Sequence, residues 1–232
     1  MNIIKVKDYN ELSKKTSEII IKEILENPHI VLGLPTGKSP LGTYKNLIKE
    51  YNKGKVDFSL IRTFNLDEYY PVKKNDKKSY RYYMFKNLFD KINVKKENIN
   101  ILDGDSKYFK KECQNFENKI KKNPIDLQIL GIGVNGHIGF NEPGSSELSK
   151  TRLVNLAPET ISRNKYKGKA LTVGISTILK SKKIILLASG KDKAKAVAGL
   201  IKGEIDKNLP ASFLKKNKNL TLIIDREAGS LL

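Results

Sequence analysis

The sequence DLQILGIGVNGHIGFNEPG, residues 126–144, joins a largely apolar run to a loop, and the stretch contains five glycines. The apolar run has the length and composition of a buried strand. Glycine permits backbone turns at positive φ and the close approach of a ligand, so the loop can direct polar side chains into one pocket. We therefore expect a buried strand that ends in a ligand-facing loop.

Similar apolar runs recur along the chain and alternate with segments whose apolar residues have helical spacing. The expected strands are 29–34, 60–66, 126–132, 170–175, 183–189 and 220–225. The expected helices are 11–25, 40–51, 80–89, 108–120 and 192–201. Continuously apolar strands that alternate with helices favour a sheet covered on both faces. The predicted fold class is α/β, a Rossmann-like three-layer sandwich with a mostly parallel central sheet.

The length of 232 residues suits one large domain, and we expect residues 1–232 to form it. The only cysteine, Cys113, cannot form an internal disulfide, which fits a reducing cytoplasm. The N-terminal residues lack the apolar core of a signal peptide. No apolar run approaches the roughly 18 residues of a membrane helix, so no membrane partner is expected.

The formal net charge of +19 raises the alternative of a basic nucleic-acid-binding module. The excess is almost entirely lysine, whereas arginine is preferred for bidentate contacts to phosphates and bases. The lysines are also scattered along the whole chain. We interpret them as solvated surface residues and expect no nucleic-acid partner. The nucleic-acid-binding module remains the alternative from a different class.

Four polar loops each follow a predicted strand: residues 35–39 (PTGKS), 67–70 (DEYY), 133–142 and 190–193 (GKDK). In a parallel sheet the carboxyl ends of the strands meet at one edge, where ligands bind. We therefore expect all four loops to open on the same edge.

The PTGKS turn has one residue too few between Gly33 and Gly37 to match the P-loop nucleotide motif. A glycine turn that leads into a helix still offers backbone N–H donors and a favourable dipole to an anion. The candidate phosphate-binding residues are those of this turn, Thr36, Gly37, Lys38 and Ser39. A plain strand-to-helix turn with Ser39 as N-cap and Pro40 at the first helical position is the other interpretation, and both can be true together.

Titratable side chains in two of the loops are candidates for proton transfer. Asp67 directly follows a buried strand, which favours a base in the pocket over a solvated turn; its neighbour Glu68 is interpreted as structural. His137 and Asn135 lie in the glycine-rich loop, and a carboxylate at Glu142 would orient the imidazole. A purely structural histidine is the alternative.

No cofactor is expected. The chain has no His/Cys cluster with the spacing of a metal site. The glycines at 131, 133 and 136 match a dinucleotide motif, but the residues after them do not read as the helix that this motif should open.

Taken together, these segments resemble the glucosamine-6-phosphate deaminase (isomerase) family. The matching stretches lie in order over roughly residues 31–203: GLPTGKSPLGTYKNL, TFNLDEYY, SYRYYMFKNLFDKINV, GIGVNGHIGFNEPGS, KALTVGISTIL and LASGKDKA. The FNEPG form is not expected of the related 6-phosphogluconolactonases. The resemblance implies hydrolytic deamination and isomerisation of glucosamine 6-phosphate to fructose 6-phosphate and ammonia, with no metal or organic cofactor.

The resemblance also implies roles for the catalytic candidates. Asp67 falls at the position of the enolisation base, and His137, supported by Glu142, at that of the ring-opening histidine. Asn135 falls at the adjacent ring-opening position, where members of the family carry aspartate or asparagine. An amide cannot carry the charge, which leaves hydrogen bonding or orientation for this residue.

For the phosphate group, the resemblance implies the turn at residues 36–39 and Lys193. Arg163 is a candidate for the arginine that binds phosphate in this family, although an alignment in direct register would place Tyr166 at that position. The chain resembles the short form of the family, and we expect a monomer or small homo-oligomer that binds a small-molecule substrate. Within the same fold, another hexose-phosphate isomerase or a 6-phosphogluconolactonase-like hydrolase is the alternative.

Overall fold

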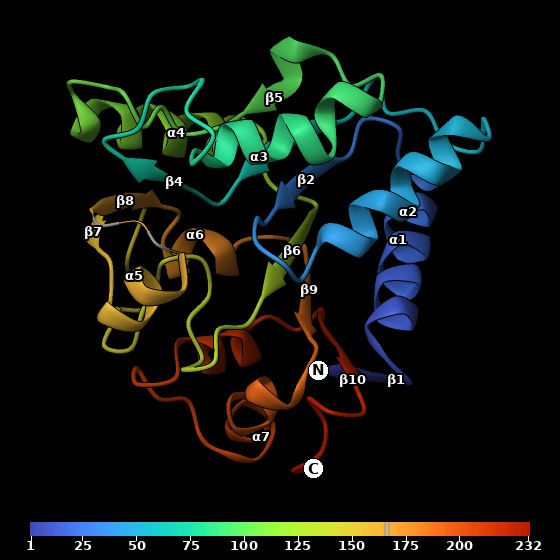
Figure 1. Cartoon of the computed structure of the whole chain (residues 1–232), viewed down its shortest axis with the longest axis vertical. Coiled ribbons are helices and arrows are strands. Elements are labelled where there is room, and N and C mark those ends of the chain that lie inside the picture. The colour runs from blue at the N-terminus through green and yellow to red at the C-terminus, as the bar shows by residue number, and fades with distance from the viewer. Residues whose placement is uncertain (165, 167) are drawn as a thin grey trace.

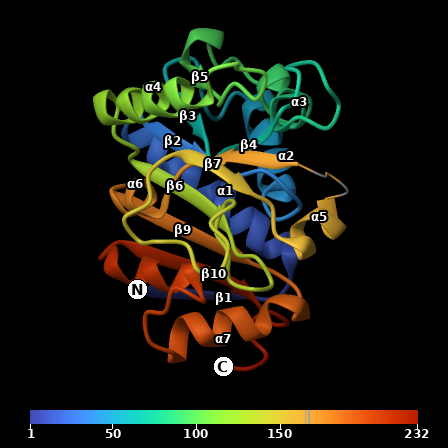
Figure 2. The ribbon, with the colours of Figure 1, turned by 90° about the vertical axis from the view of Figure 1, so that its left-hand side faces the viewer.

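The computed structural model describes residues 1–164, 166 and 168–232, without the side chains of Glu159, Arg163 and Asn164. Its central sheet consists of β1 (Asn2–Val6), β2 (Val31–Leu34), β3 (Arg62–Asn65), β5 (Ile99–Asn100), β6 (Leu127–Gly131), β9 (Lys183–Ala188) and β10 (Leu220–Asp225). The strands lie in the order β1-β10-β9-β6-β2-β3-β5, from the bottom to the top of Figure 2. Every pair is parallel, which confirms the predicted sheet type.

Helices cover both faces of this sheet because its strands carry apolar side chains on both sides. In β9, Ile184 and Leu186 pack on one side, and Ile185 and Leu187 on the other. The first face is covered by α4 (Phe109–Lys122), α6 (Ile175–Leu179), α7 (Ala194–Lys202) and the 3-10 helix η4 (Pro210–Lys216). The second is covered by α1 (Tyr9–Glu26), α2 (Leu41–Asn52) and α3 (Tyr80–Asn87), as Figure 1 shows for α1 and α2. The predicted three-layer sandwich is confirmed.

A second sheet was not predicted. It consists of the antiparallel strands β4 (Asp67–Tyr70), β8 (Lys169–Thr172) and β7 (Arg152–Asn155). The segment expected as a loop at 67–70 is therefore a strand, and the strand expected at 170–175 pairs with it instead of joining the central sheet. Both expectations were wrong because local hydrophobic pattern does not reveal which distant segment a short strand pairs with.

The register of this second sheet brings three polar residues together. Asp67 lies opposite Thr172, and Thr172 lies opposite Arg152 on its other side. Directly opposed residues of neighbouring strands point to the same face of a sheet. The three side chains therefore share one face.

Local capping explains where two of the helices begin. Asp8 accepts hydrogen bonds from the N–H groups of Asn10 and Glu11 and so begins α1. Ser79 accepts one from the N–H of Tyr82 and begins α3. The other short helices are α5 (Pro158–Asn164), η1 (Phe89–Lys91), η2 (Lys96–Asn98) and η3 (Lys191–Lys193). Within the described part of the chain, no helix combines the length and apolar character needed to cross a bilayer.

Candidate active site

Four segments lie at one edge of the central sheet. They follow β9, β6, β2 and β3, which are consecutive in the sheet and run parallel. The segments are residues 190–193, residues 133–142, residues 35–39 and the start of β4 at Asp67. Their strands end together at the edge where open α/β sheets bind ligands, as the sequence led us to expect.

The loop after β6 folds back so that His137 packs against its own beginning. The Gly133 N–H donates a hydrogen bond to the His137 carbonyl over 2.8 Å. A Cβ atom at residue 133 would lie 2.4 Å from the imidazole, so a side chain there would displace the ring. Gly136 makes the intervening turn at a φ of 82°. The glycines therefore determine where the imidazole lies.

His137, Asn135 and Glu142 form one hydrogen-bonded group. Nδ1 of His137 lies 2.8 Å from Oδ1 of Asn135 and 3.2 Å from Oε2 of Glu142. Nδ2 of Asn135 donates to the same Oε2 over 2.9 Å. Both neighbours of Nδ1 are oxygen acceptors, so this nitrogen carries a hydrogen. Nε2 is then the ring nitrogen that can accept a proton from a ligand.

Glu142 is held in its charged form. Burial favours the neutral acid, but hydrogen bonds from His137, Thr160 and Asn135, with the positive charge that His137 carries when it is protonated, outweigh it and lower the pKa of Glu142 to about 2. The Thr160 hydroxyl donates to Oε1 over 2.5 Å. Sequence reasoning missed Thr160, because it lies in α5, in a segment with no recognisable motif.

Asp67 is buried and touches two of the other segments. Its side chain accepts a hydrogen bond from Thr36. A Cβ atom at Gly139 would lie 3.4 Å from Oδ2 of Asp67 and 3.2 Å from the hydroxyl oxygen of Thr172. Burial raises the pKa of Asp67 to about 8, and the charge of Glu68 adds to this effect, while the Thr36 hydrogen bond opposes it. Asp67 therefore joins the turn at residues 35–39 to the glycine-rich loop.

Glu68 caps a helix instead of facing this group. Its carboxylate accepts hydrogen bonds from the N–H groups of Tyr69 (2.8 Å), Tyr80 (2.7 Å) and Arg81 (2.8 Å), the last two in the first turn of α3. Burial raises the pKa of Glu68 to about 7, although these donors act against the shift. The geometry agrees with the structural interpretation of this residue. Among the described residues, no cluster of three or more His, Cys, Asp or Glu side chains could hold a metal ion.

Thr36, Gly37, Lys38 and Ser39 form the turn between β2 and α2, with Gly37 at a φ of 88°. A Cβ atom at Gly131 would lie 3.3 Å from the Ser39 hydroxyl oxygen, so the turn also contacts the end of β6. Helix α2 begins at Leu41 without a side-chain cap, so Ser39 is not the N-cap that the alternative interpretation required. A helix start beside a glycine turn can hold an anion.

Lys193 lies at the end of η3, after β9. Its side chain is 14% exposed, and its Nζ lies 3.8 Å from Oδ2 of Asp192. Lys191, at the other end of the same short helix, is exposed. The partial burial of Lys193 distinguishes it from the exposed lysine beside it.

The candidate phosphate arginine cannot be placed by its side chain. Arg163 lies in α5, and its side chain falls outside the described residues. Tyr166, which occupies the direct register, stacks on Tyr69 with ring centroids 4.1 Å apart. Its hydroxyl donates to the Pro71 carbonyl over 2.7 Å.

Asn141 and Arg152 hold the end of the glycine-rich loop. Nδ2 of Asn141 donates to the carbonyls of Ile138 and Val173, each over 2.9 Å. Nη1 of Arg152 donates to Oδ1 of Asn141 over 2.8 Å. Sequence reasoning missed both residues. The FNEPG motif could have indicated Asn141, but the contact of Arg152 depends on the unpredicted second sheet.

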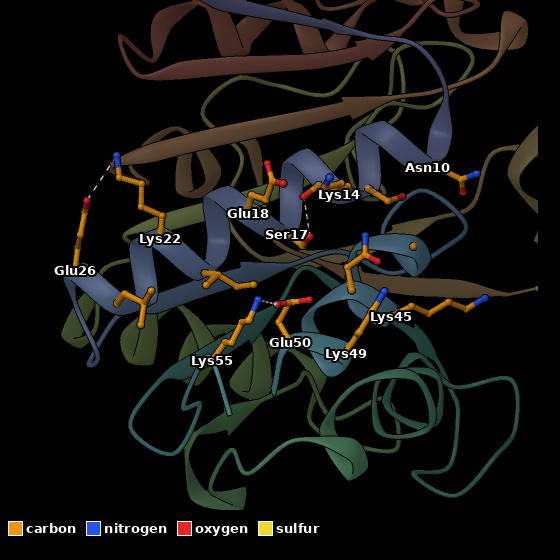
Figure 3. A pocket seen from close by; sticks show the side chains of 15 residues that line it. Asn10, Lys14, Ser17, Glu18, Lys22, Glu26, Lys45, Lys49, Glu50 and Lys55 are labelled. Carbon is orange, nitrogen blue, oxygen red and sulfur yellow. Dashed lines mark hydrogen bonds and ion pairs between the residues drawn. The ribbon is translucent and has the colours of Figure 1, made fainter. Parts of the chain in front are cut away.

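A groove runs between α1 and α2 (Figure 3). It is lined by side chains of both helices and of Lys55, among them Lys14, Glu18, Lys49 and Glu50. Lys55 pairs with Glu50 across 3.1 Å. None of the candidate catalytic or phosphate-binding residues lines the groove, and we assign no site to it.

Comparison with known proteins gives one consistent family. Residues 7–223 match the family model described as glucosamine-6-phosphate isomerases/6-phosphogluconolactonase. A protein of Clostridium novyi (strain NT) named glucosamine-6-phosphate deaminase is 50% identical, with both chains covered completely. A protein of Thermoanaerobacter pseudethanolicus with the same name is 49% identical. The alignment covers 100% of this chain and 95% of that protein.

Solved structures agree with this result. The structure of a monomeric glucosamine-6-phosphate deaminase superposes with a TM-score of 0.97 at 42% identity, and the alignment covers all of both chains. The 6-phosphogluconolactonase of Trypanosoma cruzi superposes with a TM-score of 0.85 at 21% identity, over 100% of this chain and 96% of that one. At that identity the second comparison supports the fold alone.

Proposed function

Because the chain belongs to the glucosamine-6-phosphate isomerase/6-phosphogluconolactonase family, we propose that it converts glucosamine 6-phosphate and water to fructose 6-phosphate and ammonia. Full-length relatives at 49–50% identity carry the deaminase name, whereas two 6-phosphogluconolactonase structures with the same fold are 20–21% identical. The observation that carries the proposal is the position of Asp67, which is hydrogen-bonded to Thr36 and has Oδ2 3.4 Å from where a Cβ atom at Gly139 would lie. One base is thereby joined to an anion-binding turn and to the loop that carries an imidazole.

Ring opening is the first step of the proposed reaction. The substrate arrives as a closed pyranose, and a proton must move from the anomeric hydroxyl to the ring oxygen. Nε2 of His137 can accept and return this proton, because Nδ1 faces Asn135 and Glu142. Glu142 orients the ring and stabilises the positive charge that forms on it, as carboxylates do beside histidine in other hydrolases.

Enolisation follows at carbon 2 of the open aldehyde. Asp67 removes the proton from carbon 2, the carbonyl oxygen at carbon 1 takes up a proton from water, and an enolamine forms. A carboxylate whose pKa is raised by burial to about 8 is a stronger base than one in water. Asp67 then returns the proton to carbon 1, which leaves an imine at carbon 2. Water adds to this carbon and ammonia leaves, so that the ketone of fructose 6-phosphate remains.

The phosphate group supplies binding energy at a distance from the reacting carbons. We assign it to the turn of Thr36, Gly37, Lys38 and Ser39 and to Lys193, which follow nearby strands at the same sheet edge. Interactions with a non-reacting group hold carbon 2 in position for Asp67. Arg163 is kept as a further candidate for this role.

We also propose a cytoplasmic monomer that folds as one domain. The structural relative at 42% identity is described as monomeric. The family match runs from residue 7 to residue 223 without a division. The single cysteine, Cys113, is free and buried, as suits a reducing compartment.

A coupled assay for ammonia and fructose 6-phosphate tests the function. We expect the protein to release both from glucosamine 6-phosphate in equal amounts, without added metal or cofactor. Glucose 6-phosphate, other amino-sugar phosphates and 6-phosphogluconolactone serve as competing substrates, and Asp67→Asn is the inactive control. Lactone hydrolysis without ammonia release would identify the protein as a lactonase instead.

A further inference from the structure

Three tyrosine hydroxyls donate hydrogen bonds to carbonyl groups of the turn at residues 35–39. Tyr44 donates to the Pro35 carbonyl over 2.5 Å. Tyr83 donates to the carbonyl of Gly37 over 2.5 Å, and Tyr9 to that of Lys38 over 2.9 Å. The tyrosines come from α2, α3 and α1 respectively, so each of these three α-helices on this face of the sheet contributes one.

These contacts determine the direction of the N–H groups. In a trans peptide the C=O and N–H bonds point in opposite directions. The carbonyls of residues 35, 37 and 38 belong to the peptides whose N–H groups are those of Thr36, Lys38 and Ser39. With the carbonyls turned toward the three tyrosines, these N–H groups point away from them.

The N–H groups of the turn are also available to a ligand. Across the described chain, no backbone hydrogen bond is donated by residues 36–39. A Cβ atom placed on Gly37 would meet nothing within 4 Å, so the space beside the turn is open. Successive N–H groups that point into open space beside a helix start form a concave anion site.

Tyr9 adds a second function at this helix start. Its hydroxyl accepts a hydrogen bond from the N–H of Gly42 over 2.8 Å while it donates to the Lys38 carbonyl. Gly42 is the second residue of α2, which has no side-chain cap of its own. Tyr9 therefore links the turn at residues 36–39 to α2 and fixes the position of the turn relative to the helix.

We propose that Tyr9, Tyr44 and Tyr83 are positioning residues that orient the N–H groups of Thr36, Lys38 and Ser39 toward the phosphate of the substrate. This inference rests on the proposed function for the identity of the ligand. A flexible turn would have to be ordered when phosphate binds, whereas a turn held on three sides is ordered beforehand. The hydroxyl groups should therefore contribute to phosphate affinity without touching the substrate.

The variants Tyr9→Phe and Tyr83→Phe test this, because both residues are only partly buried and the change removes one oxygen each. Tyr44 is 1% exposed, so Tyr44→Phe serves as a third variant, interpreted only with its melting temperature. Tyr82→Phe is the matched control. It lies beside Tyr83 on α3, and within the described residues its hydroxyl makes no contact with the turn.

Two quantities are measured: the KM for glucosamine 6-phosphate, and the Kd for inorganic phosphate by calorimetry. We expect Tyr9→Phe and Tyr83→Phe each to raise both by about two- to tenfold, with a smaller effect on kcat, and the double variant to raise them further. Tyr82→Phe should change neither. A purely structural role would lower the melting temperature and leave both constants unchanged.

The phosphate measurement separates this inference from the proposed function. If the wild-type protein releases no ammonia, the deaminase proposal fails, while phosphate binding still decides the role of the tyrosines. If Tyr9→Phe and Tyr83→Phe bind phosphate as tightly as Tyr82→Phe, the positioning role is overturned. The same holds if the wild-type protein does not bind inorganic phosphate at all.

Discussion

Asp67 and Glu68 are consecutive residues of β4, yet their carboxylates serve different parts of the molecule. Successive side chains of a strand point to opposite faces. Asp67 lies against Gly139 and bonds Thr36, whereas Glu68 binds the N–H groups at the start of α3. The pair therefore combines a buried carboxylate that faces the site with one that anchors a helix.

Replacing Asp67 by asparagine should abolish activity and stabilise the fold. We expect deamination to fall by at least about 10³-fold, together with proton exchange at carbon 2. The folded pKa of Asp67, about 8, lies above its ordinary value of 3.8. The neutral form is thus favoured in the folded state, and stability is lost as pH rises from about 4 to 8. Asparagine cannot ionise, so the variant does not lose this stability as pH rises.

Melting temperatures of the wild type and Asp67→Asn at pH 5 and pH 9 check the second part. We expect the variant to gain on the order of 1–3 kcal/mol relative to wild type at the higher pH, and less at the lower one. Asp105→Asn, at an exposed loop position, is the control and should show no such difference. Retained proton exchange at carbon 2 would remove Asp67 from its assigned role.

Glu68→Gln should move the pH profile of kcat/KM. The charge of Glu68 raises the pKa of Asp67, so its removal lowers that pKa. Because Asp67 must be ionised to act as a base, we expect the acid limb of the profile to shift toward lower pH. The measurement is the midpoint of that limb for wild type and variant. A shift toward higher pH would contradict the assignment of this limb to Asp67.

The central sheet could be predicted because most of its strands lie in largely apolar runs, although β3 itself is mostly polar. Such runs occur where a strand is covered on both faces, and strand–helix alternation then implies parallel pairing. β5, with only two residues, and β1, at the sheet edge, lack such a run. The second sheet was missed because the pairing of β4 with β8 joins segments about a hundred residues apart.

The candidate site was predicted where its residues are close in sequence. Asn135, His137 and Glu142 lie within one motif, and their hydrogen bonds agree with the predicted cluster. Thr160 and the three tyrosine hydroxyls act from distant helices through single oxygen atoms. Nothing in hydrophobic pattern or spacing marks such a contact, so only the three-dimensional structure reveals them.

Thr160→Val should remove one of the hydrogen bonds that stabilise the ionised form of Glu142. The folded pKa of Glu142, about 2, lies below its ordinary value of 4.5, so its ionised form stabilises the fold above about pH 4.5 and loses that effect as pH falls through 2. Loss of the Thr160 donor raises this pKa. We expect about 1 kcal/mol less stability at neutral pH and acid unfolding at a higher pH.

Acid titrations of Thr160→Val and Thr160→Ser followed by circular dichroism measure this effect. Serine keeps the hydroxyl and should restore most of the stability and of kcat. Equal losses in the two variants would indicate that packing of the Thr160 methyl group, and not its hydrogen bond to Glu142, is what matters.

Lys193→Ala should weaken binding of phosphorylated sugars more than it slows the chemistry. Its side chain is largely buried at the sheet edge that carries the turn at residues 36–39, so its charge is less screened by solvent than that of an exposed lysine. We expect the KM for glucosamine 6-phosphate to rise about 10- to 100-fold, with a much smaller change in kcat. Lys191→Ala removes the same charge from the exposed end of η3 and should change KM less than about twofold. Equal effects of the two variants would mean that Lys193 contributes only to the overall positive charge near the site. A specific contact with phosphate would depend on the partly buried amine of Lys193 and not on the exposed amine of Lys191.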